Sequence, residues 1–210
     1  MALGRLYGNQ NAECLVFLVC MNQQEAEDIG TMLEETKEDF AILPCIPFSW
    51  ENDLTPYEAS NPFKKGSMFS GWADCFLKEI LVVTESLPAK RRILAGYSLA
   101  GLFALYAGTR CSAFDGLVAG SPSLWYPDFV GYAQTHPLNP SVRHVYLSIG
   151  DLESKTKNPT FQTIDQKIGE YCGMLESSRI SFCFERNHGK HVDRVKERMA
   201  RGIREALLFR

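Results

Sequence analysis

One serine of this sequence stands in a segment typical of a catalytic nucleophile. Ser98 lies in GYSLAG (residues 96–101), after the apolar run RRILAGY and before the apolar segment LFALYAG. A serine on a sharp strand-to-helix turn sits in strained backbone geometry, so the residues two positions to either side must be small. Gly96 and Ala100 meet this requirement, with alanine in place of the second glycine of the G-x-S-x-G pattern. We predict that Ser98 is a nucleophile; the alternative is a serine that only caps the helix.

A serine hydroxyl needs a base to become a nucleophile, and the base needs an acid that orients it. In hydrolases with this motif the acid follows the serine and the histidine follows the acid. Two carboxylates, Asp151 and Glu153, come directly after the apolar run HVYLSI, and two histidines, His188 and His191, lie before the last helical segment. We predict His188 as the base because glycine follows it, and keep His191 as the alternate; the other two histidines have structural interpretations.

An acyl transfer also needs two amides that stabilise the oxyanion. The amide of Leu99, at the start of the helix, is the first expected donor. The second should follow the early strand, where Met21 is our candidate and Asn22 the alternative. Phosphate-loop, dinucleotide-binding and zinc-cluster patterns are absent from the sequence, so neither a cofactor nor a metal is expected.

Alternating strands and helices must position these groups. Apolar runs typical of strands lie at 14–20, 40–46, 91–97, 114–119, 143–149 and 179–184, and helix-period segments lie at 23–38, 67–86, 160–176 and 192–208. Several runs are apolar on both faces, which indicates parallel strands covered by helices on each side. The last segment places its basic residues, Arg198 among them, on an outer face that we interpret as solvated. The pattern predicts an α/β fold with a mostly parallel sheet, whose active site forms at the carboxyl ends of the strands.

Composition excludes several classes of protein. The 210 residues include 45% hydrophobic and 22% charged residues, with a formal net charge of −3, as in a soluble globular protein of one domain, 1–210. This charge balance offers no footprint for nucleic acid or an anionic membrane. The seven cysteines are scattered without a C-x-x-C pair, and the N-terminus lacks a signal-peptide pattern. We therefore expect free thiols and a cytoplasmic location.

Three segments resemble one branch of the α/β-hydrolases, which includes feruloyl esterases, esterase D, enterochelin esterases and mycolyltransferases. GYSLAGLFALYAG is similar to the nucleophile turn and helix of that family, and SPSLWY (121–126) resembles its "SPSLWW" stretch. GDLE (150–153) resembles a Gly-x-x-acid segment of the family, which favours Glu153 over Asp151 as the acid. The resemblance covers about residues 90–210. It implies a three-layer α/β/α sandwich and a serine carboxylesterase.

The resemblance also frames the expected substrate. We expect an acyl-enzyme on Ser98 and a small acyl or aryl ester as substrate, with a thioesterase, peptidase or acyltransferase, or a catalytically silent binding protein, as alternatives. Trp50, Tyr57, Trp125 and Tyr126 follow two strands and are candidates for the pocket rim, with rim packing as the other interpretation. The chain has no long cap insertion after Trp125, which predicts a minimal cap and a shallow pocket, or one completed by a second subunit in a homo-oligomer.

Overall fold

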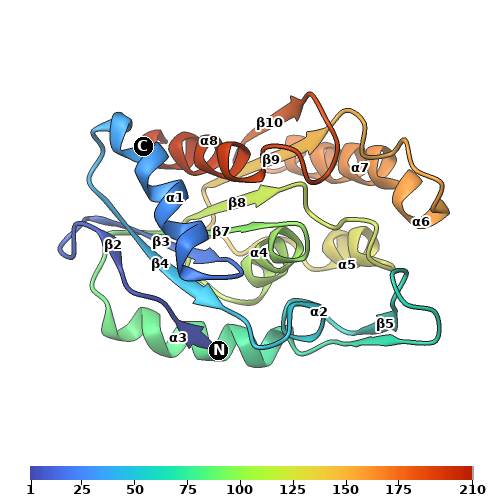
Figure 1. The fold of residues 1–210 in the computed structure, drawn as a ribbon, viewed down its shortest axis with the longest axis horizontal. Helices are drawn as coiled ribbons and strands as arrows, with labels where there is room; N and C mark the ends of the chain where they lie inside the picture. The colour runs from blue at the N-terminus through green and yellow to red at the C-terminus, as the bar shows by residue number, and fades with distance from the viewer. Residues whose placement is uncertain (210) are drawn as a thin grey trace.

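An eight-stranded sheet forms the centre of the computed structural model, which describes residues 1–209. Its strands are β1 (Ala2–Leu3), β2 (Tyr7–Gly8), β3 (Cys14–Val19), β4 (Phe40–Ile46), β7 (Arg91–Tyr97), β8 (Gly116–Gly120), β9 (His144–Gly150) and β10 (Ser181–Asn187). They lie in the order β1-β4-β3-β7-β8-β9-β10, with β2 paired separately with β4 (Figure 1). The six long strands pair in parallel, and only the short β1 and β2 run antiparallel to β4. The prediction of a mostly parallel sheet is confirmed.

Helices cover both faces of this sheet. Helices α1 (Gln23–Leu33) and α8 (Val195–Leu208) pack on one face, and α3 (Ala73–Ser86), α4 (Leu99–Arg110), α5 (Phe129–Thr135) and α7 (Ile164–Glu176) pack on the other (Figure 1). Strand β3 shows why the sequence pattern indicated this arrangement. Its residues Leu15 and Phe17 join one core cluster, whereas Val16 and Leu18 join the other, so every position of the strand is buried. A strand covered on both faces has no polar face to show.

Several element boundaries differ from the predicted ones. The segment 67–86 begins with strand β6 (Met68–Ser70), which pairs with β5 (Glu58–Ser60), so helix α3 starts only at Ala73. The segment 23–38 leaves the α-helix at Leu33 and turns at Lys37, which has a φ of 57°. Two short helices, α2 (Trp50–Asp53) and α6 (Pro159–Gln162), are added around the sheet's carboxyl edge. Local pairing and turn chemistry therefore decided these ends, while the hydrophobic period decided where the elements lie.

Strand β10 is shifted relative to its prediction, and the shift matters for the site. The strand was expected at 179–184 but runs from Ser181 to Asn187, because it pairs residue by residue with β9 up to Gly150. The loop that carries the histidines therefore begins three residues later than expected.

The strand order contains a switch point beside β3, at the carboxyl edge of the sheet. The chain goes from β3 outward to β4 and then returns to the other side of β3 as β7. At such a switch point the loops after the two neighbouring strands diverge, which leaves space for a ligand. Here the loop after β7 carries Ser98, and the loop after β3 carries Met21.

No helix within residues 1–209 is long and apolar enough to cross a bilayer. All seven cysteines are free thiols, as expected from their scattered positions.

Candidate active site

The turn from β7 into α4 holds Ser98 in strained geometry. Ser98 has φ 60° and ψ −120°, a conformation that costs a non-glycine residue about 1–3 kcal/mol. The neighbours must be small: a Cβ on Gly96 would lie 2.5 Å from the carbonyl group of Ala100, and one on Gly101 would lie 3.1 Å from the carbonyl oxygen of Gly96. The Ser98 amide donates to the carbonyl of Gly120 at 2.9 Å, which fixes the turn against β8. The surroundings thus hold the serine at the apex, as the motif predicted.

His191, the alternate base, lies beside this serine. Its Nε2 is 2.9 Å from Ser98 Oγ, and its Nδ1 is 2.7 Å from Glu153 Oε2. An ionised carboxylate only accepts hydrogen bonds, so Nδ1 donates to Glu153 and Nε2 is left to accept the serine proton. The arrangement has the geometry that base activation of a serine requires.

His188, our predicted base, does not reach Ser98. Its side chain is 89% exposed and its Nδ1 lies 3.1 Å from Asp151 Oδ2. Because β10 extends to Asn187, His188 is the first residue past the strand and projects into solvent. The chain then turns at Gly189, whose φ is 123°, and comes back over the sheet edge at His191. The prediction of His188 was therefore wrong because the strand ends three residues later than the sequence indicated.

Glu153 is the more buried of the two carboxylates. Oε1 accepts from the hydroxyl of Ser121 at 2.6 Å, the amide of Gly150 at 2.7 Å and a guanidinium nitrogen of Arg198 at 3.2 Å. Burial raises the pKa of Glu153, but the hydrogen bond and charge of His191, together with the Ser121 and Gly150 donors, outweigh it and hold the pKa below its usual value. Glu153 is therefore ionised at neutral pH.

Two polar side chains in this network were not singled out from the sequence. Ser121 begins the SPSLWY stretch and adopts a φ of 40°, which is unusual for a residue before proline. Arg198 was placed on a solvated face of the last helix, but its side chain is 2% exposed. That interpretation was wrong because α8 packs across the sheet with this position turned inward. The only signal in the sequence was the helical register: Arg198 precedes the buried Met199 and Ala200.

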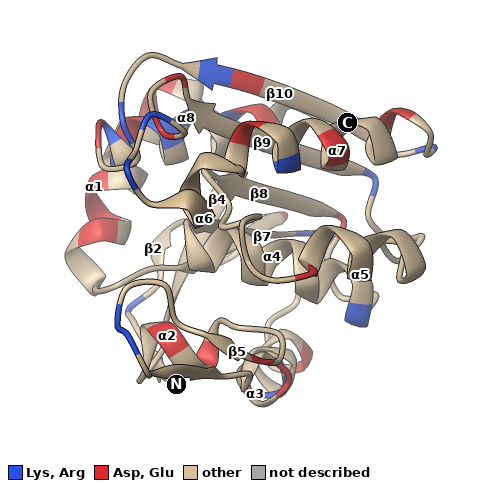
Figure 2. Ribbon diagram, turned by 90° about the vertical axis from the view of Figure 1, so that its right-hand side faces the viewer, with Lys and Arg blue, Asp and Glu red and all other residues tan. Residues whose placement is uncertain are grey.

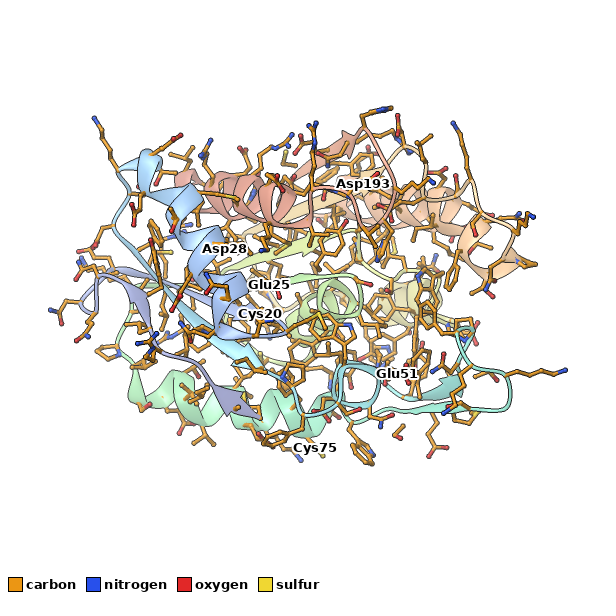
Figure 3. The ribbon with its side chains drawn as sticks, viewed as in Figure 1. Cys20, Glu25, Asp28, Glu51, Cys75 and Asp193 are labelled. Atoms are coloured by element: carbon orange, nitrogen blue, oxygen red, sulfur yellow. The ribbon has the colours of Figure 1, made fainter. Side chains whose placement is uncertain are left out.

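The two predicted oxyanion donors differ in their surroundings. Leu99 is the first residue of α4, where the backbone amides of a helix have no partner within the helix. The Met21 amide instead donates to Glu25 Oε2 at 2.9 Å, and Glu25 in turn is bonded through its own amide to the side chain of Asn22. This is a capping arrangement at the start of α1, where Figure 3 shows Glu25 close to Cys20. The Met21 amide is thus committed to Glu25, and the amide of Asn22 remains the alternative.

A pocket of about 400 Å³ opens at Ser98 and His191. Three aromatic side chains line it and contact one another: Phe63 and Phe161 each lie against Trp125, with ring centroids 5.6 and 5.0 Å apart. Lys155 and Lys190 line it as well, and neither ammonium forms an ion pair among the described residues. Figure 2 shows basic residues at the tip of β10 and on nearby loops of this face.

Of the four predicted rim residues, only Trp125 lines this pocket. Tyr126 is 1% exposed and its hydroxyl donates to the backbone of Tyr57. Tyr57 packs edge-on against Tyr126 and donates to the carbonyl of Pro127 at 2.6 Å, while Trp50 packs against the core. These three residues therefore support the rim instead of forming it. Phe63 and Phe161 were missed because each lies on a separate loop or short helix with no strand signal beside it.

Another cavity of the protein, of about 960 Å³, lies away from this chemistry. It is lined by the loops around residues 133–143 and 173–181 and includes neither Ser98 nor His191. We place the candidate active site at the smaller pocket because the polar network converges there. Among residues 1–209, no group of three or more His, Cys, Asp or Glu side chains could hold a metal ion.

Comparisons with known proteins agree with this fold. No protein-family model and no curated protein matches the chain significantly. Solved structures do. The siderophore hydrolase EstA from Aspergillus nidulans has 22% identity and a TM-score of 0.67, with coverage of 94% of this chain and 83% of EstA.

Two further structures extend this likeness. An IroE-like serine hydrolase from Shewanella oneidensis has 16% identity and a TM-score of 0.74, with coverage of 95% and 71% of the two chains. A ferulic acid esterase has 15% identity and a TM-score of 0.60, with coverage of 95% and 85%. The chain is thus similar to esterases of α/β-hydrolase type, and the likeness shows that it has the α/β-hydrolase fold.

Proposed function

We propose that this protein is a serine carboxylesterase. One observation carries the proposal: Ser98 Oγ, on a strained turn, lies 2.9 Å from Nε2 of a histidine whose Nδ1 is held by a buried, ionised glutamate. A catalytically silent hydrolase fold has no need to preserve this alignment, so the geometry favours an enzyme. The three similar structures described above are hydrolases or esterases, which supports the same reaction class.

The reaction follows from the positions of these groups. Ser98 Oγ attacks the ester carbonyl while His191 Nε2 takes its proton, and the charge that develops on the carbonyl oxygen faces the amide of Leu99. The resulting imidazolium is stabilised by Glu153. His191 then gives the proton to the departing alkoxide or phenoxide, which leaves an acyl-enzyme. Water, deprotonated by His191, attacks the acyl group and restores Ser98.

The pocket supports small aryl esters as substrates. Three aromatic walls suit a ring that packs edge-on or offset against them, and a pocket of about 400 Å³ has the size that a small aryl ester needs. Lys155 and Lys190, whose ammonium groups form no ion pair among the described residues, favour a negative substituent on that ring. We therefore propose aryl esters that carry an acidic group as the preferred substrates.

The chemistry is tested by labelling and by a substrate panel. A fluorophosphonate should label the wild-type protein and should not label Ser98→Ala. With p-nitrophenyl esters from acetate to palmitate, we expect kcat/KM to fall as the chain lengthens. Thioester and amide analogues of the best ester separate the thioesterase and peptidase alternatives. An unlabelled wild-type protein would refute the proposal.

The charge preference is tested with two lysine variants. We expect Lys155→Gln and Lys190→Gln to lower kcat/KM about 3–10-fold for a benzoate ester with a ring carboxylate. The kcat/KM for the matching ester without the carboxylate should stay unchanged. Salt should weaken the same preference. Lys78→Gln on the exposed face of α3 is the control. Equal effects on both esters would contradict a charge-specific role.

A further inference from the structure

A buried cation lies beside the candidate active site and has no part in the proposed chemistry. Arg198, in the first turn of α8, is 2% exposed and does not line the pocket at Ser98. Its guanidinium donates to Glu153 Oε1 at 3.2 Å and to the hydroxyl of Ser121, and it lies 5.2 Å from the ring centroid of Tyr97. A buried arginine is costly, and an apolar residue of similar size would often stabilise a fold equally well. Stability alone therefore does not account for a charge at this position.

The contacts of Glu153 indicate what the charge does. Its two carboxylate oxygens have different partners: Oε1 accepts from Ser121, Gly150 and Arg198, whereas His191 Nδ1 is the partner of Oε2. A turn of the carboxylate would break all three contacts of Oε1. The three donors therefore fix the plane of the group and direct Oε2 at the imidazole.

The donors are themselves fixed. The Tyr97 hydroxyl oxygen lies 3.0 Å from Ser121 Oγ and 2.7 Å from the backbone oxygen of His191, so one side chain ties the donor network to the histidine loop. Ser121 adopts a positive φ of 40°, a strain that is retained where surrounding contacts demand it. Tyr97 is the residue directly before Ser98, so the nucleophile turn, the acid and the base share one set of anchors.

We propose that Arg198 is a positioning residue for catalysis, which acts with Ser121 by clamping Oε1 of Glu153 so that Oε2 holds the His191 imidazole toward Ser98. The inference rests on the proposed esterase function. In the acylation step His191 becomes a cation, and Glu153 must stay ionised and aligned at that moment. Arg198 stabilises the ionised carboxylate from the side away from His191, and so does not compete for the same oxygen.

The test uses Arg198→Met, Arg198→Lys and Ser121→Ala in the full chain. We expect Arg198→Met to lower kcat about 10²-fold with little change in KM, because a misplaced catalytic group affects the chemical step. Arg198→Lys should recover part of the loss, since an ammonium keeps the charge but cannot bridge both partners as a planar guanidinium does. The double variant with Ser121→Ala should lose less than the product of the two single losses, because both residues act on one oxygen.

Fluorophosphonate labelling separates misplacement from misfolding. In a folded variant the labelling rate should fall in parallel with kcat while the final extent of labelling remains complete. Arg201→Gln, three residues further along α8, is the matched control, because Arg201 forms a partly exposed ion pair with Glu185 and should leave kcat unchanged. If Arg198→Met does not fold, Arg198→Lys and Ser121→Ala carry the same test.

Three results would overturn the inference while the esterase function stands. In each case the wild-type enzyme is active. The first result is a wild-type kcat in both Arg198→Lys and Ser121→Ala, and the second is a change in these variants that is confined to KM. The third is a loss of kcat in the double variant that equals the product of the two single losses. A wild-type protein that neither takes the label nor cleaves esters would instead refute the proposed function.

Discussion

Two acid–histidine pairs stand next to one another at the carboxyl edge of the sheet. Glu153 and His191 form one pair, 2.7 Å apart, and Asp151 and His188 form the other, 3.1 Å apart. Both pairs join the loop after β9 to the loop after β10, and both use the Nδ1 atom of the imidazole. From residue types and spacing alone the two pairs are nearly equivalent.

Their surroundings separate them. The side chains of His188 and Asp151 are 89% and 38% exposed, whereas those of His191 and Glu153 are 39% and 5% exposed. Only the second pair continues to a third group, because His191 Nε2 meets Ser98 while His188 Nε2 faces solvent. An exposed pair in water gains little from its charges. A partly buried pair with a fixed third partner can transfer a proton to and from that partner. Burial and the contact with Ser98, and not the acid–histidine pair itself, therefore identify the candidate catalytic unit.

The histidine variants should give the largest difference between the two pairs. We expect His191→Ala to lower kcat by about 10⁴–10⁶-fold, because the serine loses its base. His188→Ala should keep kcat within about twofold, as for a surface substitution away from the chemistry. Steady-state kinetics on a p-nitrophenyl ester measure both. A loss in His188→Ala as large as that in His191→Ala would restore our first assignment.

The carboxylate variants should give the next largest effect. Glu153→Gln should lower kcat by about 10⁴-fold, because an amide can turn its donor toward Nδ1 and so favour the wrong tautomer. Asp151→Asn should have little effect on kcat.

The stability of Glu153→Gln should also differ from that of the wild type in its pH dependence. The pKa of Glu153 is lower in the folded state than its value of about 4.3 in the unfolded chain. The ionised carboxylate therefore stabilises the folded protein fully at pH values above about 4.3, and this stabilisation is lost as pH falls through the folded-state pKa. The stability difference between wild type and Glu153→Gln, from urea titrations, should therefore shrink below about pH 4. A difference that grows toward acid would contradict an ionised Glu153.

The nucleophile turn could be predicted from the sequence because it is a local structure. Ser98 is held by small residues two or three positions away, and the strand before it and the helix after it show their own hydrophobic patterns. The same holds for the order of strands and helices, since a strand such as β3 is apolar at each position. These features depend on neighbours in sequence, which a single chain displays directly.

The base and the pocket depend on contacts between distant segments. Where β10 ends is set by its register with β9, which decides that His188 points outward and His191 inward. Arg198 looks like one more basic residue of an amphipathic helix until α8 is packed on the sheet. Phe63 and Phe161 meet only in the folded protein, with ring centroids 5.1 Å apart. No pattern within one segment shows where β10 ends or that these two rings meet.

A third histidine, His144, shows what burial does to a ring that has no hydrogen-bond partner: it keeps the ring from taking up a proton. His144, at the start of β9, is 3% exposed, stacks on Phe209 and has no hydrogen-bond partner for either ring nitrogen among the described residues. Burial, and then the charge of Arg91, lower the pKa of His144, so the folded protein keeps this ring neutral. In the unfolded chain the same histidine binds a proton below about pH 6.5. Protonation therefore favours the unfolded state, and the free energy of unfolding decreases as pH falls below that value.

We expect His144→Phe to remove this acid sensitivity, which is the smallest of the effects predicted for these variants. Between pH 7.5 and pH 5, the free energy of unfolding of the wild type should fall more than that of the variant, because unfolding of the wild type exposes a histidine that then binds a proton. Urea titrations at the two pH values measure the difference, and His136→Phe at an exposed position is the control. An equal fall in wild type and variant would show that His144 binds its proton in the folded state. Burial without hydrogen-bond partners would then not keep a histidine neutral, and it could not explain why His144 differs from His191.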